Sequence, residues 1–129
     1  LVELTDILPT LLESCGMAVP EHVEGKSLAG ILRGTATSKH REILRSEYHD
    51  SQTNVHHSHA TMIRDERYKL VVYHGTGLGE LFDHAEDASE FRNLFALDAG
   101  RSVRARMMEQ MLDHIALRTD LGQPRIGRY

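Results

Sequence analysis

Apolar residues recur three and four positions apart near the start of the chain, which is the spacing of one face of an amphipathic helix. The pattern predicts a helix running from residue 6 to Ser14, with four residues on its buried face: Ile7, Leu8, Leu11 and Leu12. We expect Asp6 to cap this helix through its side chain and Gly16 to end it. Cys15, which closes the apolar stretch, is expected to be buried.

A second, shorter helix is predicted after residues 17–26, which contain a proline and a glycine and indicate a loop. Ser27 can cap this helix and Gly34 can end it. Its apolar side is formed by Leu28, Ile31 and Leu32. The polar residues 35–40 indicate a linker between this helix and the next element.

Segments with strand character come after the linker, and they predict four short antiparallel strands. The strands are expected at residues 43–48, 60–63, 68–73 and 80–82. The charged residues 64–67 suit a hairpin connection between the second and the third strand. Three glycines, Gly75, Gly77 and Gly79, indicate the turn before the fourth.

A long helix is predicted at residues 98–118, because apolar residues recur along it every four positions. The stripe consists of Val103, Met107, Met111 and Ile115, with Met108 and Leu112 beside it. Such a stripe has to be buried, and the preceding sheet offers the surface. The chain is therefore predicted to be α+β, a four-stranded antiparallel sheet with a long C-terminal helix on one face. The last ten residues indicate an irregular tail.

The composition narrows the classes of partner. The formal net charge is −4 and the pI is about 6.1, so there is no electrostatic reason to expect nucleic acid or an anionic membrane. No apolar run approaches the roughly 18 residues of a membrane span. The single cysteine cannot form an internal disulfide, so the sequence leaves the cellular compartment open.

Histidines concentrate between the first two predicted strands, where residues 49–59 contain four of them and one apolar residue. This composition predicts a surface loop. Its candidates for substrate binding are His49, Asp50, His56, His57 and His59. Imidazoles donate hydrogen bonds to anionic oxygens and change charge near neutral pH. Two other interpretations stay open: a solvated loop without a direct role, and adventitious binding of zinc or nickel.

The segment LFDHAEDASEFRNL, residues 81–94, is the most informative motif of the chain. We expect it to contain a strand end, a turn and the start of a helix. Asp87 can cap the turn, and Asn93 tolerates a left-handed conformation. The motif therefore predicts structure rather than catalysis.

Four segments together resemble the C-terminal part of the sulfatases. They are DILPTLL at residues 6–12, GKSL at 25–28, the hairpin from Ile63 to Leu70, and the motif at 81–94. Ala88 stands where the family usually has proline. Sulfatases belong to the alkaline-phosphatase superfamily and hydrolyse sulfate esters through a formylglycine made from cysteine or serine. The resemblance implies that residues 1–40 are the helical end of the large α/β domain and that 41–129 form a C-terminal subdomain.

The resemblance also implies that the catalytic groups lie elsewhere. The formylglycine motif CxPxR or SxPxR does not occur in the chain, and Cys15 is followed by Gly16, Met17, Ala18 and Val19. We expect the formylglycine and the calcium in the N-terminal sulfatase domain, the partner of this chain, and neither a catalytic residue nor a metal ligand here. The chain alone is then inactive and structural, contributes to the rim of the cleft for the sulfate ester, and self-associates through exposed apolar surface. The alternatives are a noncatalytic scaffold or association module, and a histidine-rich metal-binding protein.

Overall fold

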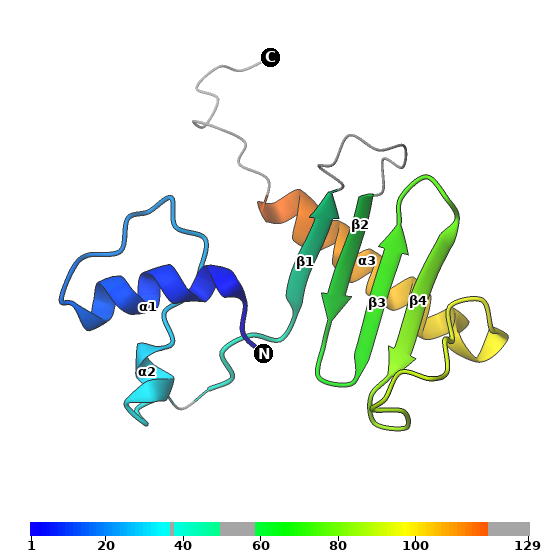
Figure 1. Cartoon of the computed structure of the whole chain (residues 1–129), viewed down its shortest axis with the longest axis horizontal. Coiled ribbons are helices and arrows are strands. Elements are labelled where there is room, and N and C mark those ends of the chain that lie inside the picture. Colours follow the sequence, from blue (N-terminus) through cyan, green and yellow to red (C-terminus); the bar gives the residue numbers. More distant parts are fainter. Residues whose placement is uncertain (37, 50–58, 119–129) are drawn as a thin grey trace, which may run out of the picture.

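The computed structural model describes residues 1–36, 38–49 and 59–118. In chain order the helices and strands are η1 (Leu4–Asp6), α1 (Ile7–Ser14), α2 (Ala29–Leu32), β1 (Leu44–His49), β2 (His59–Arg64), β3 (Tyr68–Tyr73), β4 (Leu78–Asp83), η2 (Asp98–Gly100) and α3 (Arg101–Arg118). The helices α1 and α2 lie beside the β1 edge of the sheet, and α3 crosses one face of it (Figure 1). The predicted α+β architecture is confirmed.

The four strands form one antiparallel sheet in the order β1-β2-β3-β4, so each strand pairs with its neighbour in sequence. The third strand has the predicted bounds, and the others differ by one residue at each end, or by two at the start of β4. The prediction was wrong for Gly79, which lies inside β4 rather than in the turn. A Cβ atom at this position would lie 2.2 Å from the Phe95 ring, so the glycine lets that ring approach the strand.

The core lies between the sheet and α3. Ile63, Leu70 and Leu81 stand opposite one another on adjacent strands, and each is fully buried. Met107 and Met111 of α3 pack against them, as the helical stripe predicted. Met108 and Leu112 beside the stripe are instead 37% and 69% exposed. The sheet therefore covers a narrower strip of α3 than the sequence indicates.

The first two helices end where the sequence predicted. In α1, the Gly16 N–H donates to Glu13 O at 3.0 Å and the Met17 N–H donates to Leu12 O at 2.9 Å, while Gly16 has a φ of 71°. This is a Schellman close, and Gly34 forms the same close after α2. The prediction for Cys15 was wrong, because this cysteine is exposed at the end of α1.

The apolar face of α1, which the sequence predicted to be buried, is exposed in this chain. Within the described residues the helix buries Pro9 and Thr10, whereas Ile7, Leu8 and Leu11 are half exposed or more. On the buried side of the helix, the Thr10 hydroxyl accepts a hydrogen bond from the Leu28 N–H at 2.8 Å. A polar contact holds the loop to the helix on one side and leaves the apolar stripe facing outward.

Asp6 precedes α1 but makes no side-chain cap to it, which corrects the sequence prediction; its carboxylate belongs instead to a capping box at the start of η1. Its carboxylate is fully buried and accepts hydrogen bonds from the backbone N–H groups of Glu3 at 2.9 Å and Lys26 at 2.8 Å. The Arg41 guanidinium donates to both of its oxygens, and His40 Nε2 lies 3.0 Å away. Burial acts to raise the pKa of Asp6, but these hydrogen bonds outweigh it and hold the pKa well below its usual value.

The motif at residues 81–94 forms turns, and no helix begins in it, contrary to expectation. Asp87 accepts a hydrogen bond from the Arg92 N–H at 2.7 Å, which confirms its role as a cap. The left-handed residue is Glu90, with a φ of 59°, rather than Asn93. The Glu90 carboxylate contacts Lys69 Nζ at 2.5 Å and His84 Nε2 at 2.7 Å, and these contacts hold the turn against the sheet.

The Asn93 side chain instead forms hydrogen bonds with the outer edge of β4. Its Oδ1 accepts from the Leu81 N–H, and its Nδ2 donates to Gly79 O, both at 3.0 Å. The Leu94 N–H donates to Leu81 O at 2.8 Å. These bonds satisfy backbone groups that would otherwise stand open at the sheet edge.

Asp83 at the end of β4 gives a prediction about acid stability. Its carboxylate accepts two hydrogen bonds from Arg67, each 2.8 Å long, and these hold the pKa of Asp83 below its usual value. A carboxylate with a lowered folded pKa stabilises the fold above its unfolded pKa, about 3.9, and this is lost as pH falls further. The Asp83→Asn variant should therefore lose less stability than the parent protein between pH 6 and pH 3 in urea titrations.

The matched control for this titration is Asp113→Asn, since Asp113 is an exposed residue of α3. That variant should lose as much stability between pH 6 and pH 3 as the parent protein does. Equal acid dependence in the parent protein and in Asp83→Asn would show that the pair with Arg67 does not contribute.

Candidate functional site

Three imidazoles lie in a row across one end of the sheet. His49 ends β1 and is paired in register with His59, the first residue of β2. Their ring centroids are 3.7 Å apart with an interplanar angle of 32°. His74 follows β3, and its N–H donates to His59 O at 2.8 Å, which brings the centroids of these two rings to 4.6 Å. Strand pairing thus assembles the row from three separate parts of the chain.

The row contains two of the five residues predicted to bind substrate, His49 and His59. The other three, Asp50, His56 and His57, lie outside the described residues. His74 was not predicted. The register of β2 and β3 was the missing signal: Ile63 stands opposite Leu70, which places residue 74 opposite residue 59. A connection at residues 64–67 would have shifted this pairing.

The middle ring of the row has an unusual environment. The pKa of His59 is lowered, first by burial and then by the neighbouring imidazoles of His49 and His74, while Glu47 acts in the opposite direction. His59 Nε2 is buried and has no hydrogen-bond partner among the described residues. The Thr61 hydroxyl lies 2.8 Å from His74 Nε2 and orients the last ring of the row. The lowered pKa favours an uncharged His59 at neutral pH.

A surface hollow of about 220 Å³ adjoins the row, and it is lined by His59, Tyr73, His74, Thr76 and Leu78. The Tyr73 hydroxyl donates to Glu80 Oε1 at 2.9 Å, and the Thr76 hydroxyl donates to Tyr73 O at 2.8 Å. These hydroxyl groups already have protein partners.

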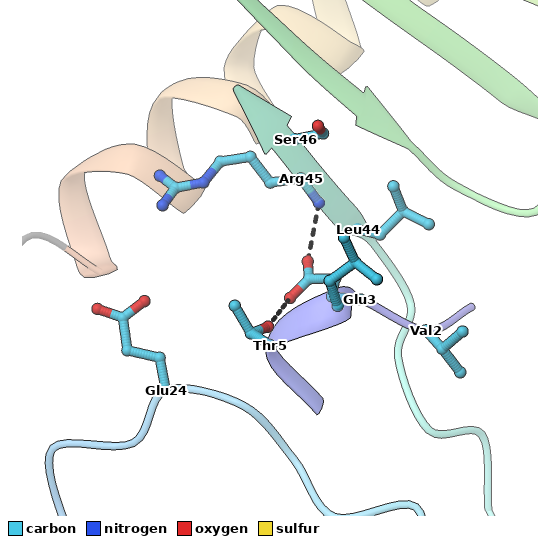
Figure 2. A pocket seen from close by; sticks show the side chains of 8 residues that line it. Val2, Glu3, Thr5, Glu24, Leu44, Arg45 and Ser46 are labelled. Atoms are coloured by element: carbon cyan, nitrogen blue, oxygen red, sulfur yellow. Dashed lines mark hydrogen bonds between the residues drawn. The ribbon is translucent and has the colours of Figure 1, made fainter. Parts of the chain in front are cut away.

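A larger hollow, about 310 Å³, lies between the start of the chain and the outer edge of β1 (Figure 2). Glu3 lies in it between Thr5 and Arg45, and its Oε1 accepts from the Arg45 N–H at 2.9 Å. Its Oε2 lies 3.2 Å from Arg41 Nη2. The Glu3 carboxylate connects the N-terminal helical part to the sheet. We therefore interpret this hollow as part of the contact between the two.

The described residues do not fit a calcium ion, and the sequence contains no formylglycine motif. In the part of the chain that the structure describes, no three His, Cys, Asp or Glu side chains gather closely enough to hold a metal. Asp83 and Asp87 in the motif are committed to Arg67 and to backbone N–H groups. Cys15 is exposed and lacks the proline and arginine of the formylglycine motif. Over the same described ranges, no helix has the length and apolar character of a membrane span.

Exposed apolar side chains gather on the helical part. Leu4 is 86% exposed and Leu32 is 73% exposed, and the outward stripe of α1 adds Ile7, Leu8 and Leu11. Ile7, Leu8 and Leu11 lie three or four positions apart or adjacent and share one helical face, and an exposed apolar face commonly marks a surface that a partner covers.

Comparison with known proteins agrees with this architecture. The family profile for the C-terminal domain of N-sulphoglucosamine sulphohydrolase matches residues 1–117. A Delta 4,5-hexuronate-2-O-sulfatase of Bacteroides thetaiotaomicron is 38% identical over 89 residues, which are 69% of this chain and 18% of that protein. A solved 2-O GAG sulfatase superposes with a TM-score of 0.80 at 30% identity, over 96% of this chain and 27% of the other.

The fold is therefore that of a sulfatase C-terminal region, an antiparallel sheet with a long helix on one face and short helices before it. The chain belongs to the N-sulphoglucosamine sulphohydrolase C-terminal family, which confirms the resemblance stated from the sequence. It spans about a fifth of the length of the curated relatives that it matches first. A region of a phosphonate monoester hydrolase from Silicibacter pomeroyi has the same fold, with a TM-score of 0.77 at 30% identity over 90% of this chain and 25% of the other.

Proposed function

We propose that this chain is the noncatalytic C-terminal subdomain of a sulfuric ester hydrolase and that the remaining polypeptide supplies the formylglycine and the calcium. The observation that carries the proposal is the family match over residues 1–117, in a chain whose sequence has no formylglycine motif. The histidine end of the sheet would then stand at the rim of the cleft, where it contacts the substrate.

The proposal divides the chain at residue 40. Residues 1–40 would complete the large domain, and residues 41–129 would form the subdomain built on the sheet. Support comes from the outward apolar stripe of α1, which gives the large domain a surface to cover. A scaffold or association module without any enzymatic parent is not favoured, because the curated sulfatase relatives contain the same region.

An activity assay tests the proposal. The isolated chain and the full-length polypeptide that contains it are incubated with 4-nitrophenyl sulfate and with 4-nitrophenyl phenylphosphonate. We expect no turnover by the isolated chain and hydrolysis of the sulfate ester by the full-length protein. Turnover by the isolated chain that depends on Cys15 would contradict the proposal. A preference of the full-length protein for the phosphonate ester would instead favour the chemistry named for the Silicibacter pomeroyi relative.

The rim hypothesis has its own test in the full-length protein. His49→Ala is expected to change kcat/KM by different factors for different sulfate esters, because a rim residue contacts the variable part of the substrate. Thermal stability should change little, since His49 is exposed. The matched control is His22→Ala, at an exposed position in the loop before α2. Equal kcat/KM values for the His49 variant and the parent enzyme across the panel would reject the hypothesis.

A further inference from the structure

The row of three imidazoles closes one end of the sheet. The pair of His49 with His59 is the last in the register between β1 and β2. On the other side of β2, the His74 N–H donates to His59 O at 2.8 Å, one residue beyond the last registered pair of β2 with β3, Ala60 with Tyr73. Strand ends open more readily than strand centres, because fewer contacts hold them. The charge of the row therefore acts on a part of the sheet that opens easily.

A positive charge on the middle ring is poorly accommodated while the row is closed. An imidazolium carries an N–H on both nitrogens, and His59 Nε2 is buried without an acceptor among the described residues. The ring centroids of His49 and His74 are 3.7 Å and 4.6 Å away, so a proton on either neighbour places like charges in contact. Both features disfavour the charged form. Once the strand ends separate, water solvates the same ring and these costs disappear.

We infer that the row of imidazoles is a pH-sensitive contact, which holds the ends of β1 and β2 together at neutral pH and releases them in mildly acidic solution. Each ring comes from a different part of the chain, so separation of either strand end breaks the row. The inference goes beyond the proposed function and does not depend on it, since opening of the sheet is measured without any catalytic reaction. If the histidine end also stands at the rim of the cleft, the same protonation loosens that rim.

The pKa of His59 gives the direction of the effect. Burial lowers it first, the imidazoles of His49 and His74 lower it further, and Glu47 of β1 raises it by a smaller amount. A histidine with a lowered pKa in the closed sheet binds its proton more readily once the strand end has opened. The row therefore stabilises this end fully above about pH 6.5, the usual histidine pKa, and the stabilisation is lost as pH falls below that value.

Two further titratable groups lie beside the row, Tyr73 and Glu80. Tyr73 lines the hollow next to His59, and its hydroxyl donates to Glu80 Oε1 at 2.9 Å. This hydrogen bond raises the pKa of Tyr73, so the phenol stays uncharged over the range in which histidine titrates. The Thr61 hydroxyl, 2.8 Å from His74 Nε2, is uncharged as well. The change of charge in mild acid thus comes from the imidazoles.

Amide hydrogen exchange of the full chain, followed by NMR at pH 7.5 and pH 5.5, tests the inference. The probes are the amides of Tyr48, Ala60 and His74 at the histidine end, each corrected for its intrinsic exchange rate. They should be less protected than the Leu70 amide in the sheet centre, because the end opens locally. Their protection should fall severalfold on acidification, and about tenfold is the limit for one imidazole with an ordinary pKa in the open state. Protection equal to that of Leu70, or no fall in acid, overturns the inference.

A substitution of the middle ring identifies the group that titrates. His59→Phe keeps a ring in the row and removes its nitrogens, so protection at this end should depend much less on pH. The matched control is His22→Phe, in the exposed loop before α2, which should keep the pH dependence of the parent protein. A folded His59→Phe variant with the parent's pH dependence contradicts the inference. If that variant does not fold, the NMR titration of the His59 ring in the parent protein decides: a midpoint below about 6.5 supports the inference, and one at or above that value overturns it.

Discussion

Replacement of Asp6 by alanine is expected to lower the free energy of unfolding by about 3–5 kcal/mol, the usual range when one partner of a buried ion pair is removed. Asp6 is fully buried, and Arg41, with 4% of its surface exposed, is its main partner. In the variant the Arg41 guanidinium keeps Glu3 at 3.2 Å but loses the carboxylate that accepts from two of its nitrogens. The backbone N–H groups of Glu3 and Lys26 lose their acceptor as well.

Urea titration followed by circular dichroism measures this loss. Glu21→Ala is the matched control, because Glu21 is an exposed acidic residue in the loop before α2. The midpoint should fall strongly for Asp6→Ala and stay nearly unchanged for the control. Equal midpoints in the two variants would show that Asp6 does not join the helical part to the sheet.

A double substitution separates the ion pair from the backbone contacts. Asp6→Leu combined with Arg41→Met replaces both charges by apolar groups, and such replacements of buried pairs are often close to neutral. Here the double variant should be more stable than Asp6→Ala alone. It should remain less stable than the parent protein, because the Glu3 and Lys26 N–H groups still lack an acceptor.

Asp6 also illustrates where the sequence ceases to be informative. Its position before an apolar run is that of a helix cap, which is a local signal. Its actual partners include His40 and Arg41, 34 and 35 residues further along the chain. A local sequence pattern does not indicate which residues pair over such a separation. The same holds for α1, whose apolar stripe was evident while the side that packs in the described part carries the contact between Thr10 and Leu28.

The sheet and α3 were predictable for the opposite reason. Their signals are periodic, with apolar residues alternating in strands and recurring every four positions in the helix, and each period survives small errors in the bounds. The candidate site depends on register, which is more sensitive. His49 and His59 were found because both lie in one histidine-rich segment, whereas His74 required the pairing of Ile63 with Leu70.

Gly25 is the second position where a single substitution should have a large effect. A Cβ atom built there would lie 1.9 Å from Thr5 O and 2.5 Å from Thr5 C. Both atoms belong to the backbone of η1, which cannot rotate away as a flexible side chain does. The loop before α2 therefore packs on the start of the chain only if residue 25 has no side chain. This proximity also brings the Lys26 N–H to Asp6.

Gly25→Ala is accordingly expected to lower the free energy of unfolding by about 3 kcal/mol, the upper part of the range for overpacking, because the backbone must shift and the Lys26 hydrogen bond weakens with it. Gly30→Ala is the matched control. Its Cβ would meet nothing nearer than 3.8 Å, and it lies in α2, where alanine is favoured over glycine by about 0.5–1 kcal/mol. The same substitution should thus change the urea midpoint in opposite directions at the two sites. A stabilising Gly25→Ala substitution would mean that residues 5 and 25 do not pack as described. The hydrogen bond from the Lys26 N–H to Asp6 would then be in doubt as well.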